Sequence, residues 1–289
     1  ILYFRCDITE EYTCKNILSV EYYDELIEIF EAIHRTSKGS VIPFTIPILD
    51  DELFFLFSLT PFLLSFGGGI FDETGKIILN AQKNIEAFRW LKQFITEGHV
   101  NLTNVYSNNR QLFARGKLAF IMEGPWMRSM IPAFSGSART WEEHTGFMTL
   151  PKTPNGRSAS VLWNHTHSIF KQCSDKELAK EFLRYLTLDP EVSSRYYRRT
   201  GMLPVRKSQI QNNPVFNDDF GKVLQQQLTS ARPIQVLDPS SFLLSITICA
   251  KAAREILLGD AGIPETLNSH TEIIRAVQKA GLKQQHIIK

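Results

Sequence analysis

The chain has 289 residues, of which 43% are hydrophobic and 21% charged, and its net charge is +2 at neutral pH. This composition excludes a long disordered chain and indicates one or two globular domains. The small net charge gives no support for binding to nucleic acid or to a membrane surface. The most apolar run, 53–66, is short and contains Pro61, so we expect a buried helix and not a membrane span. Because the chain begins on the apolar run from Ile1 to Phe4, without Met, we expect a mature or truncated product.

Apolar residues recur at helical spacing along much of the chain. The predicted helices are 20–35, 51–66, 81–97, 108–115, 125–134, 174–187, 189–199, 214–228, 240–258 and 264–280. The predicted strands are 1–4, 41–48, the run after Gly116, 145–150 and 165–170. Proline should place the second strand at a sheet edge and should kink or break the second helix at Pro61. Strands that alternate with helices indicate an α/β protein with a mixed sheet and helices on both faces.

The most informative stretch runs from Arg110 to Met127 and reads as a helix end, a buried strand and a Gly-Pro-Trp turn. Pro125 has no N–H, so the strand's hydrogen-bond ladder must stop before it. Trp126 is therefore expected to lie just after the carboxyl end of a strand, where open α/β sheets usually bind ligands. An aromatic ring beside hydrogen-bonding side chains suits a sugar, whose C–H face stacks on the ring. A role in the core is the alternative: it stays open for Trp126 and is favoured for Trp163.

Motifs for enzymatic chemistry and for metal binding find little support. No phosphate-cradling glycine loop, serine-nucleophile motif or marked carboxylate pair occurs in the sequence. His165 and His167 lie two apart on a predicted strand, but two ligands are too few for a zinc site, so we predict no metal and no cofactor. The four cysteines are expected to be free thiols, although Cys6 and Cys14 could pair across a turn.

Four motifs, in order and over nearly the whole chain, carry a family resemblance. They are the Phe-Gly-Gly-Gly-Ile-Phe-Asp-Glu-Thr-Gly-Lys run at 66–76, the run 113–126 ending in Gly-Pro-Trp, the pair Leu150-Pro151 followed by the helix 174–182, and the run 200–206. With them the chain resembles the extracellular solute-binding proteins of ABC importers, in particular the carbohydrate-binding group that includes the maltose-binding protein.

This resemblance implies a type II periplasmic-binding-protein-like α/β fold, with two lobes, crossing strands, and a hinge that closes over the ligand. Residues 1–161 and 214–289 would form a largely complete second lobe. Residues 162–213 would belong to a first lobe that is mostly missing, with a hinge strand at about 161–166. We therefore expect the apolar faces of that segment to be exposed, namely Phe182, Leu183, Leu186 and Tyr196. The chain alone is expected to bind sugar poorly.

The resemblance also implies where a ligand would be held. Trp126 matches a sugar-stacking Trp of the family, and Trp163 and Asn164 match a strand near the cleft. The helix after Pro239 offers Phe242, and the run 54–57 offers a further aromatic in an uncertain register. The expected ligand-binding residues are Trp126, Glu123, Trp163, Asn164, Phe242, Gly68 and Met202.

The implied function is non-catalytic binding of a sugar or oligosaccharide, together with the membrane permease subunits of an ABC importer. The protein would be a monomer outside the cytoplasmic membrane, in the periplasm or anchored as a lipoprotein. One alternative is a binder of the same fold for a phosphate ester, a polyamine or an iron chelate, which Arg residues converging on Trp126 would favour. The other is a sugar-active enzyme.

Overall fold

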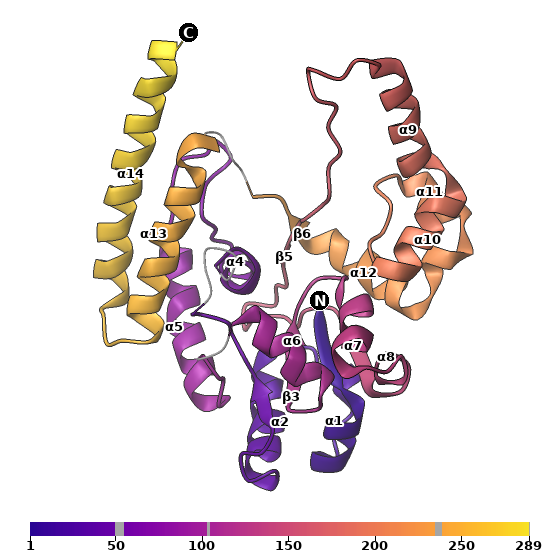
Figure 1. Cartoon of the computed structure of the whole chain (residues 1–289). Coiled ribbons are helices and arrows are strands. Elements are labelled where there is room, and N and C mark those ends of the chain that lie inside the picture. Colours follow the sequence, from indigo (N-terminus) through magenta and orange to yellow (C-terminus); the bar gives the residue numbers. More distant parts are fainter. Residues whose placement is uncertain (50–54, 103–104, 235–238, 289) are drawn as a thin grey trace.

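A four-stranded mixed sheet with helices on both faces lies in the lower part of the view in Figure 1. The computed structural model describes residues 1–49, 55–102, 105–234 and 239–288. The strands are β1 (Leu2–Arg5), β2 (Ile42–Phe44), β3 (Leu118–Met122), β4 (Thr145–Met148), β5 (Ser160–Val161) and β6 (Ala231–Arg232). The helices of the first half are α1 (Cys6–Tyr12), η1 (Ile17–Ser19), α2 (Tyr23–Thr36), η2 (Phe55–Leu59), α4 (Thr60–Ser65), α5 (Gln82–Glu97), α6 (Tyr106–Ala114), α7 (Met127–Ser135) and α8 (Arg139–His144). Those of the second half are α9 (Lys176–Leu188), α10 (Pro190–Thr200), α11 (Lys207–Asn212), η3 (Pro214–Asn217), α12 (Asp219–Ser230), α13 (Pro239–Leu257) and α14 (Ile263–Ile288).

The strand order in the sheet is β2-β3-β1-β4, with β2 parallel to β3 and β1 antiparallel to both of its neighbours. β2 lies at the edge, as its prolines predicted, because Pro43 has no N–H to give to a second neighbour. Every residue of β3 is buried. The central position of β3 brings its carboxyl end, and the turn that follows, against several neighbouring elements.

Alternate side chains of β1 belong to different cores. Leu2 and Phe4 face the larger core, which α2, α4, α5 and α13 cover, whereas Tyr3 faces a smaller core formed with α6, α7, α10 and α12. This period of two is what a strand between two helical layers requires. Each large side chain that is fully removed from water stabilises the fold by about 1.5–3 kcal/mol. The predicted α/β arrangement with helices on both faces is confirmed.

Several local predictions differ from the structure. α1 and α8 lie in stretches that were not predicted to be helical, and the predicted strand 165–170 is wrong, because these residues form an extended connection outside any strand. Their alternating pattern finds no neighbouring strand among the described residues to complete a ladder. The predicted helix 51–66 is divided at Pro61, which lies in the first turn of α4 after the π-helical turn η2; residues 50–54 lie outside the described part.

Within the described ranges, no helix has the length and apolar character needed to cross a bilayer.

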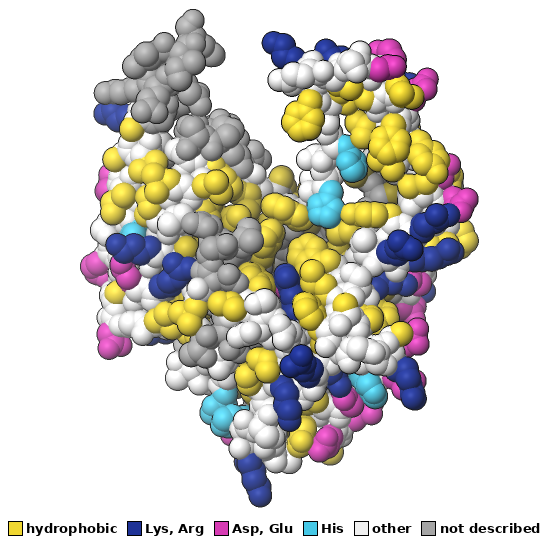
Figure 2. Space-filling view, in the orientation of Figure 1, with side chains coloured by type: hydrophobic (Ala, Val, Ile, Leu, Met, Phe, Trp, Pro, Cys, Tyr) yellow, Lys and Arg dark blue, Asp and Glu magenta, His cyan; other side chains and the backbone are white. Residues whose placement is uncertain are grey.

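β5 and β6 form a short parallel pair from which the chain leaves toward α9 and to which it returns after α12 (Figure 1). α9 has no buried residue, and Phe182 is 56% and Tyr196 44% exposed, as expected for this segment, while Leu183 and Leu186 are half-buried. Figure 2 shows hydrophobic side chains on the side of α9 and α10, and a notch between that side and α13–α14. α10 does pack on the rest of the chain, since Tyr197 is fully buried. The division into two lobes at 161 and 214 stays a prediction.

Candidate functional site

The turn that carries Trp126 is held tightly at the end of β3. Tyr3 donates a hydrogen bond from its hydroxyl to the carbonyl of Gly124 at 2.9 Å. A Cβ on Gly124 would lie 2.3 Å from the ring of Trp126, so only glycine allows the indole to fold back over the turn. Pro125 then leads directly into α7. The indole is therefore attached to a rigid part of the backbone.

Glu123 fixes the orientation of that indole. Its side chain is only 2% exposed, and its Oε2 accepts a 2.8 Å hydrogen bond from Nε1 of Trp126 and a 3.2 Å bond from the backbone N–H of Gly124. Its Oε1 is paired with Nε of Arg110 on α6. A buried carboxylate is stable only when it is paired in this way. Although Glu123 was predicted as a ligand contact, the structure gives it the geometry of a positioning residue.

Phe57 joins the two indoles that the sequence singled out. Its ring centre lies 6.5 Å from that of Trp126 and 5.1 Å from that of Trp163, at interplanar angles of 75° and 85°. Edge-to-face pairs of this kind are favourable. Trp163 is 50% exposed and Phe57 is half-buried. We call Phe57, Trp126 and Trp163 the aromatic cluster.

The cluster settles which residue of the run 54–57 accompanies the indoles. Phe55 is fully buried in the larger core, Phe54 lies outside the described residues, and Phe57 contacts both indoles. Sequence reasoning left this register open because the π-helical turn before Pro61 shifts the direction of each side chain away from that of a regular helix.

Polar groups border the cluster on one side. Ser58, the neighbour of Phe57, makes a 2.6 Å hydrogen bond with the hydroxyl of Tyr106, and the guanidinium of Arg110 lies 5.4 Å from the centre of the Tyr106 ring. Through these contacts and the Arg110–Glu123 ion pair, a continuous series of polar side chains connects Ser58, beside Phe57, with Trp126. Sequence reasoning missed Tyr106; its place at the first turn of the helix before β3 was the signal that could have indicated it.

The remaining predicted residues lie at other places. Asn164 is exposed directly after Trp163. Phe242, on α13, pairs instead with Phe71 at 6.2 Å between ring centres. Gly68 lies beneath Asn84, where a Cβ would be 2.0 Å from Oδ1, and so has a structural role. Met202 is half-buried after the end of α10. The structure thus brings together Trp126, Glu123 and Trp163, with Asn164 alongside, whereas Phe242 and Gly68 have their contacts elsewhere and Met202 follows α10.

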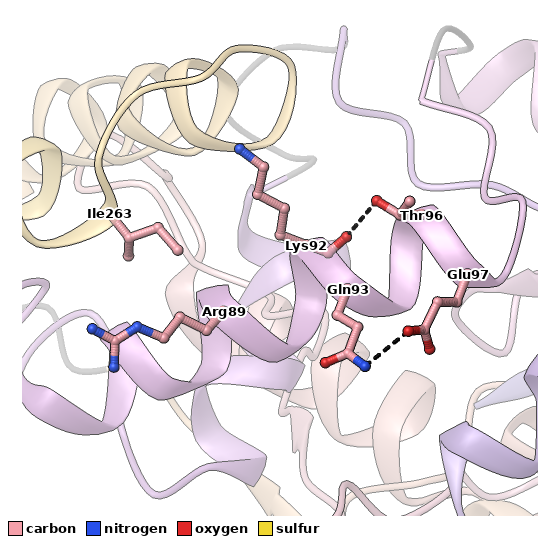
Figure 3. A pocket seen from close by; sticks show the side chains of 6 residues that line it. All are labelled: Arg89, Lys92, Gln93, Thr96, Glu97 and Ile263. Atoms are coloured by element: carbon pink, nitrogen blue, oxygen red, sulfur yellow. Dashed lines mark hydrogen bonds between the residues drawn. The ribbon is translucent and has the colours of Figure 1, made fainter.

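A shallow groove of about 400 Å³ lies on the outer face of α5 and contains none of the predicted residues (Figure 3). Its lining residues are Arg89, Lys92, Gln93, Thr96, Glu97 and Ile263. Gln93 donates to Glu97 at 2.8 Å, and Nζ of Lys92 donates to the carbonyl of Gly259 at 3.0 Å. Several polar groups of this groove are thus already bonded within the protein, as on the solvated face of an amphipathic helix.

Metal-binding geometry is not found in the described part of the chain, where no three His, Cys, Asp or Glu residues come together. The ring Nδ1 of His165 lies 2.8 Å from the hydroxyl of Tyr196, and both side chains are exposed. All four cysteines are free thiols, as expected.

Comparisons with known proteins place this site in context. A family profile described as bacterial extracellular solute-binding protein matches residues 19–192. The arabinooligosaccharide-binding protein of Halalkalibacterium halodurans is 26% identical over 260 residues, which are 80% of this chain and 52% of that protein. The galactooligosaccharide-binding protein of Bacillus subtilis is 22% identical over 97% of this chain and 64% of its own length. The chain thus spans between half and two thirds of these relatives.

Among solved structures, the maltose-bound MalE3 of T. maritima superimposes with a TM-score of 0.78 at 20% sequence identity, over 96% of this chain and 70% of that one. At this identity the likeness establishes the fold, which is that of the type II periplasmic binding proteins.

Proposed function

The chain belongs to the bacterial extracellular solute-binding proteins, and from this premise we propose that it binds a sugar or oligosaccharide as the substrate-binding component of an ABC importer. In this proposal the protein acts outside the cytoplasmic membrane and delivers its ligand to the permease subunits. Its work is binding without turnover. The relatives named for arabino- and galactooligosaccharides support the ligand class.

The observation that carries the proposal is the aromatic cluster with its fixed indole. A pyranose presents C–H groups on its faces and hydroxyls around its edge. It gains most from a flat aromatic surface beside hydrogen-bonding groups. Trp126 is held in one orientation by its hydrogen bond to Glu123. Trp163 is half exposed, and Phe57 contacts both indoles. Because the indole is already oriented, stacking costs little further conformational entropy.

The two arginines near Trp126, one in its ion-pair network and one just after it in the chain, are both neutralised, which favours an uncharged ligand at this indole. Arg110 is paired with Glu123, and Arg128, two residues beyond Trp126, is paired with Asp218 at 3.1 Å. A phosphate ester would need a positive charge that is not already neutralised, and a polyamine would need an unpaired carboxylate. The arrangement therefore supports a sugar over the charged solutes that the same fold could hold.

An enzymatic reaction on the sugar has less support. Glycoside hydrolysis uses two carboxyl groups that flank the scissile bond. The carboxylate at the cluster, Glu123, is buried and already bonded to Arg110 and to the indole of Trp126. It has neither the exposure nor the free oxygen that a nucleophile or a general base requires.

Thermal unfolding with a panel of sugars tests the proposal. For a ligand with a Kd of about 1 mM present at about 50 mM, the native state gains about 2.3 kcal/mol, because only the folded chain binds. Sugars also stabilise proteins by exclusion from their surface. The control is therefore Trp126→Ala in the same solutions, which removes the stacking face and leaves the exclusion effect.

The expected result is a rise in melting temperature for at least one oligosaccharide that is larger in the wild type than in Trp126→Ala. Glycerol phosphate, spermidine and ferric citrate at matched ionic strength should give no such difference. A specific rise with one of these charged solutes alone would overturn the choice of ligand, and turnover of an oligosaccharide would overturn the assignment as a binding protein.

A further inference from the structure

Arg128 lies two residues beyond Trp126 and connects three elements. Its Nη1 is 3.1 Å from Oδ2 of Asp218, which precedes α12. Its guanidinium carbon also lies 4.9 Å from the ring centre of Tyr197 on α10 and 5.6 Å from that of Phe220. The side chain of Arg128 is 19% exposed and that of Asp218 39%, so the cation–π contacts are largely shielded from water and the ion pair only in part. One cation thus joins the start of α7 to both α10 and α12.

Tyr197 completes the connection from the other side. Its ring is fully buried, and its hydroxyl donates a hydrogen bond to Oδ1 of Asp218. The same Oδ1 accepts a 2.8 Å bond from the backbone N–H of Gly221 and so caps α12. Asp218 therefore has a partner on each oxygen, and the geometry of the group is fully determined.

A separate contact joins the end of α10 directly to the turn of Trp126. α10 ends at Thr200 and is followed by Gly201, whose φ of +75° lies in the left-handed region. A Cβ at this position would be 2.3 Å from the carbonyl oxygen of Pro125. The backbone of α10 thus approaches the backbone of the Gly-Pro-Trp turn as closely as the absence of a side chain permits.

Beyond these contacts, the segment from α9 to α11 is attached through Leu203 and Ile210, which pack against the smaller core. α9 buries no residue, and the connection from Trp163 to Asp175 is irregular, with a turn at 171–172, and largely exposed. α10 packs mainly on α9 inside the segment and on α7 outside it. The contacts of α10 with the turn and with Asp218 therefore contribute to the position of the whole segment, together with the packing of Tyr197, Leu203 and Ile210 in the smaller core.

We propose that Arg128, Tyr197 and Asp218 are positioning residues that hold α10 against the Trp126 turn, and that they thereby set the affinity of the aromatic cluster for its ligand. The effect on affinity rests on the proposed function, whereas the positioning of α10 does not. We call the contacts among these three residues the seam. When the seam is loosened, α10 stays against the Trp126 turn in only a fraction of the molecules. The apparent Kd then rises by the inverse of that fraction.

Hydrogen exchange tests the positioning in the full chain. Tyr197→Phe removes one hydrogen bond and keeps the ring, and Arg128→Gln removes the ion pair. Each should speed amide exchange in α9 and α10 by roughly five- to tenfold, which corresponds to the net value of one or two such bonds. Exchange in α5 and β3 should stay as in the wild type. Arg139→Gln is the matched control, because its ion pair with Glu143 is exposed on α8.

Ligand titration of the same variants tests the effect on affinity. The apparent Kd for the oligosaccharide identified with the wild type should rise by about three- to tenfold in Tyr197→Phe and stay unchanged in Arg139→Gln. If exchange rises equally over the whole chain, or not at all, the positioning role is wrong. If α9 and α10 loosen while the Kd is unchanged, the effect on affinity is wrong. A wild type that binds no sugar would refute the proposed function, and the exchange data would still decide the role of the seam.

Discussion

The indole N–H of Trp126 donates to Oε2 of Glu123 at 2.8 Å, and the carboxylate that accepts it is almost fully buried. Arg110 holds the opposite oxygen. A residue that resembles a ligand contact in the sequence is therefore the support on which the stacking residue rests. Tight placement by a second layer of residues is what a binding site needs in order to avoid a loss of affinity from loose side chains.

Replacing Glu123 should separate its ion pair with Arg110 from its hydrogen bond with the indole of Trp126. Glu123→Gln keeps an oxygen for the indole and loses the ion pair, so the free energy of unfolding should fall by about 1.5–3 kcal/mol. Glu123→Ala leaves Arg110 without its partner and should cost about 3–5 kcal/mol. Urea unfolding measures both. Glu143→Gln, which breaks an exposed ion pair, should leave the midpoint unchanged. Equal losses in the Gln and Ala variants would contradict the support role.

Phe55 and Phe57 offer a matched pair on one turn. Phe55 is fully buried, so Phe55→Ala should lower the free energy of unfolding by about 3–5 kcal/mol. Phe57 is half-buried between the indoles, so Phe57→Ala should cost much less stability and weaken sugar binding by about fivefold or more, because an aromatic contact contributes about 1 kcal/mol beyond its area. Unfolding curves and sugar titrations distinguish the two. The opposite order of effects would mean that Phe57 is only a core residue.

Gly68 tests whether a predicted ligand residue is structural. A Cβ there would meet Asn84, whose side chain is fully buried and bonded to both the N–H and the carbonyl of Gly69. Gly68→Ala should therefore destabilise the fold by about 1–3 kcal/mol through overpacking. The affinity for sugar, measured in the fraction that stays folded, should not change. If Gly68→Ala instead had the stability of the wild type and lost sugar binding, Gly68 would be a ligand-binding residue.

Acid should weaken the fold through Asp7. Burial alone would raise the pKa of Asp7, but the hydrogen bond and positive charge of Arg5 outweigh burial and hold the pKa below its usual value of 3.8. A group whose pKa is lower in the folded state contributes its full stability above the unfolded value and loses it as the pH falls through the folded value. Urea midpoints measured from about pH 6 to about pH 3 should fall in the wild type. The fall should be smaller in Asp7→Asn, and an identical fall in both would contradict this assignment.

Local patterns predicted the elements that depend on nearby residues. The helix at 81–97, the strand after Gly116 and the turn at Pro125 were all predicted, because periodicity and proline chemistry act within a few residues. The strand at 165–170 was wrong because alternation needs a neighbouring strand, which no local pattern can supply. The same limit explains why the Tyr106 hydroxyl at Ser58 and the Tyr197 hydroxyl at Asp218 went unpredicted, since each joins distant parts of the chain.

The indole N–H signals of the four tryptophans give the most direct test of sugar binding at the aromatic cluster. Trp90 donates its Nε1–H to Asp24 and Trp141 is stacked on Phe147, so both serve as internal controls away from the cluster. Each signal can be assigned by a single Trp→Phe substitution in the ¹⁵N-labelled chain. During titration with an oligosaccharide to about 50 mM, the signals of Trp126 and Trp163 should shift in a saturable way while those of Trp90 and Trp141 stay in place. Saturable binding that leaves the Trp126 signal unmoved, or that shifts all four signals alike, would contradict the assignment of the cluster as the binding surface.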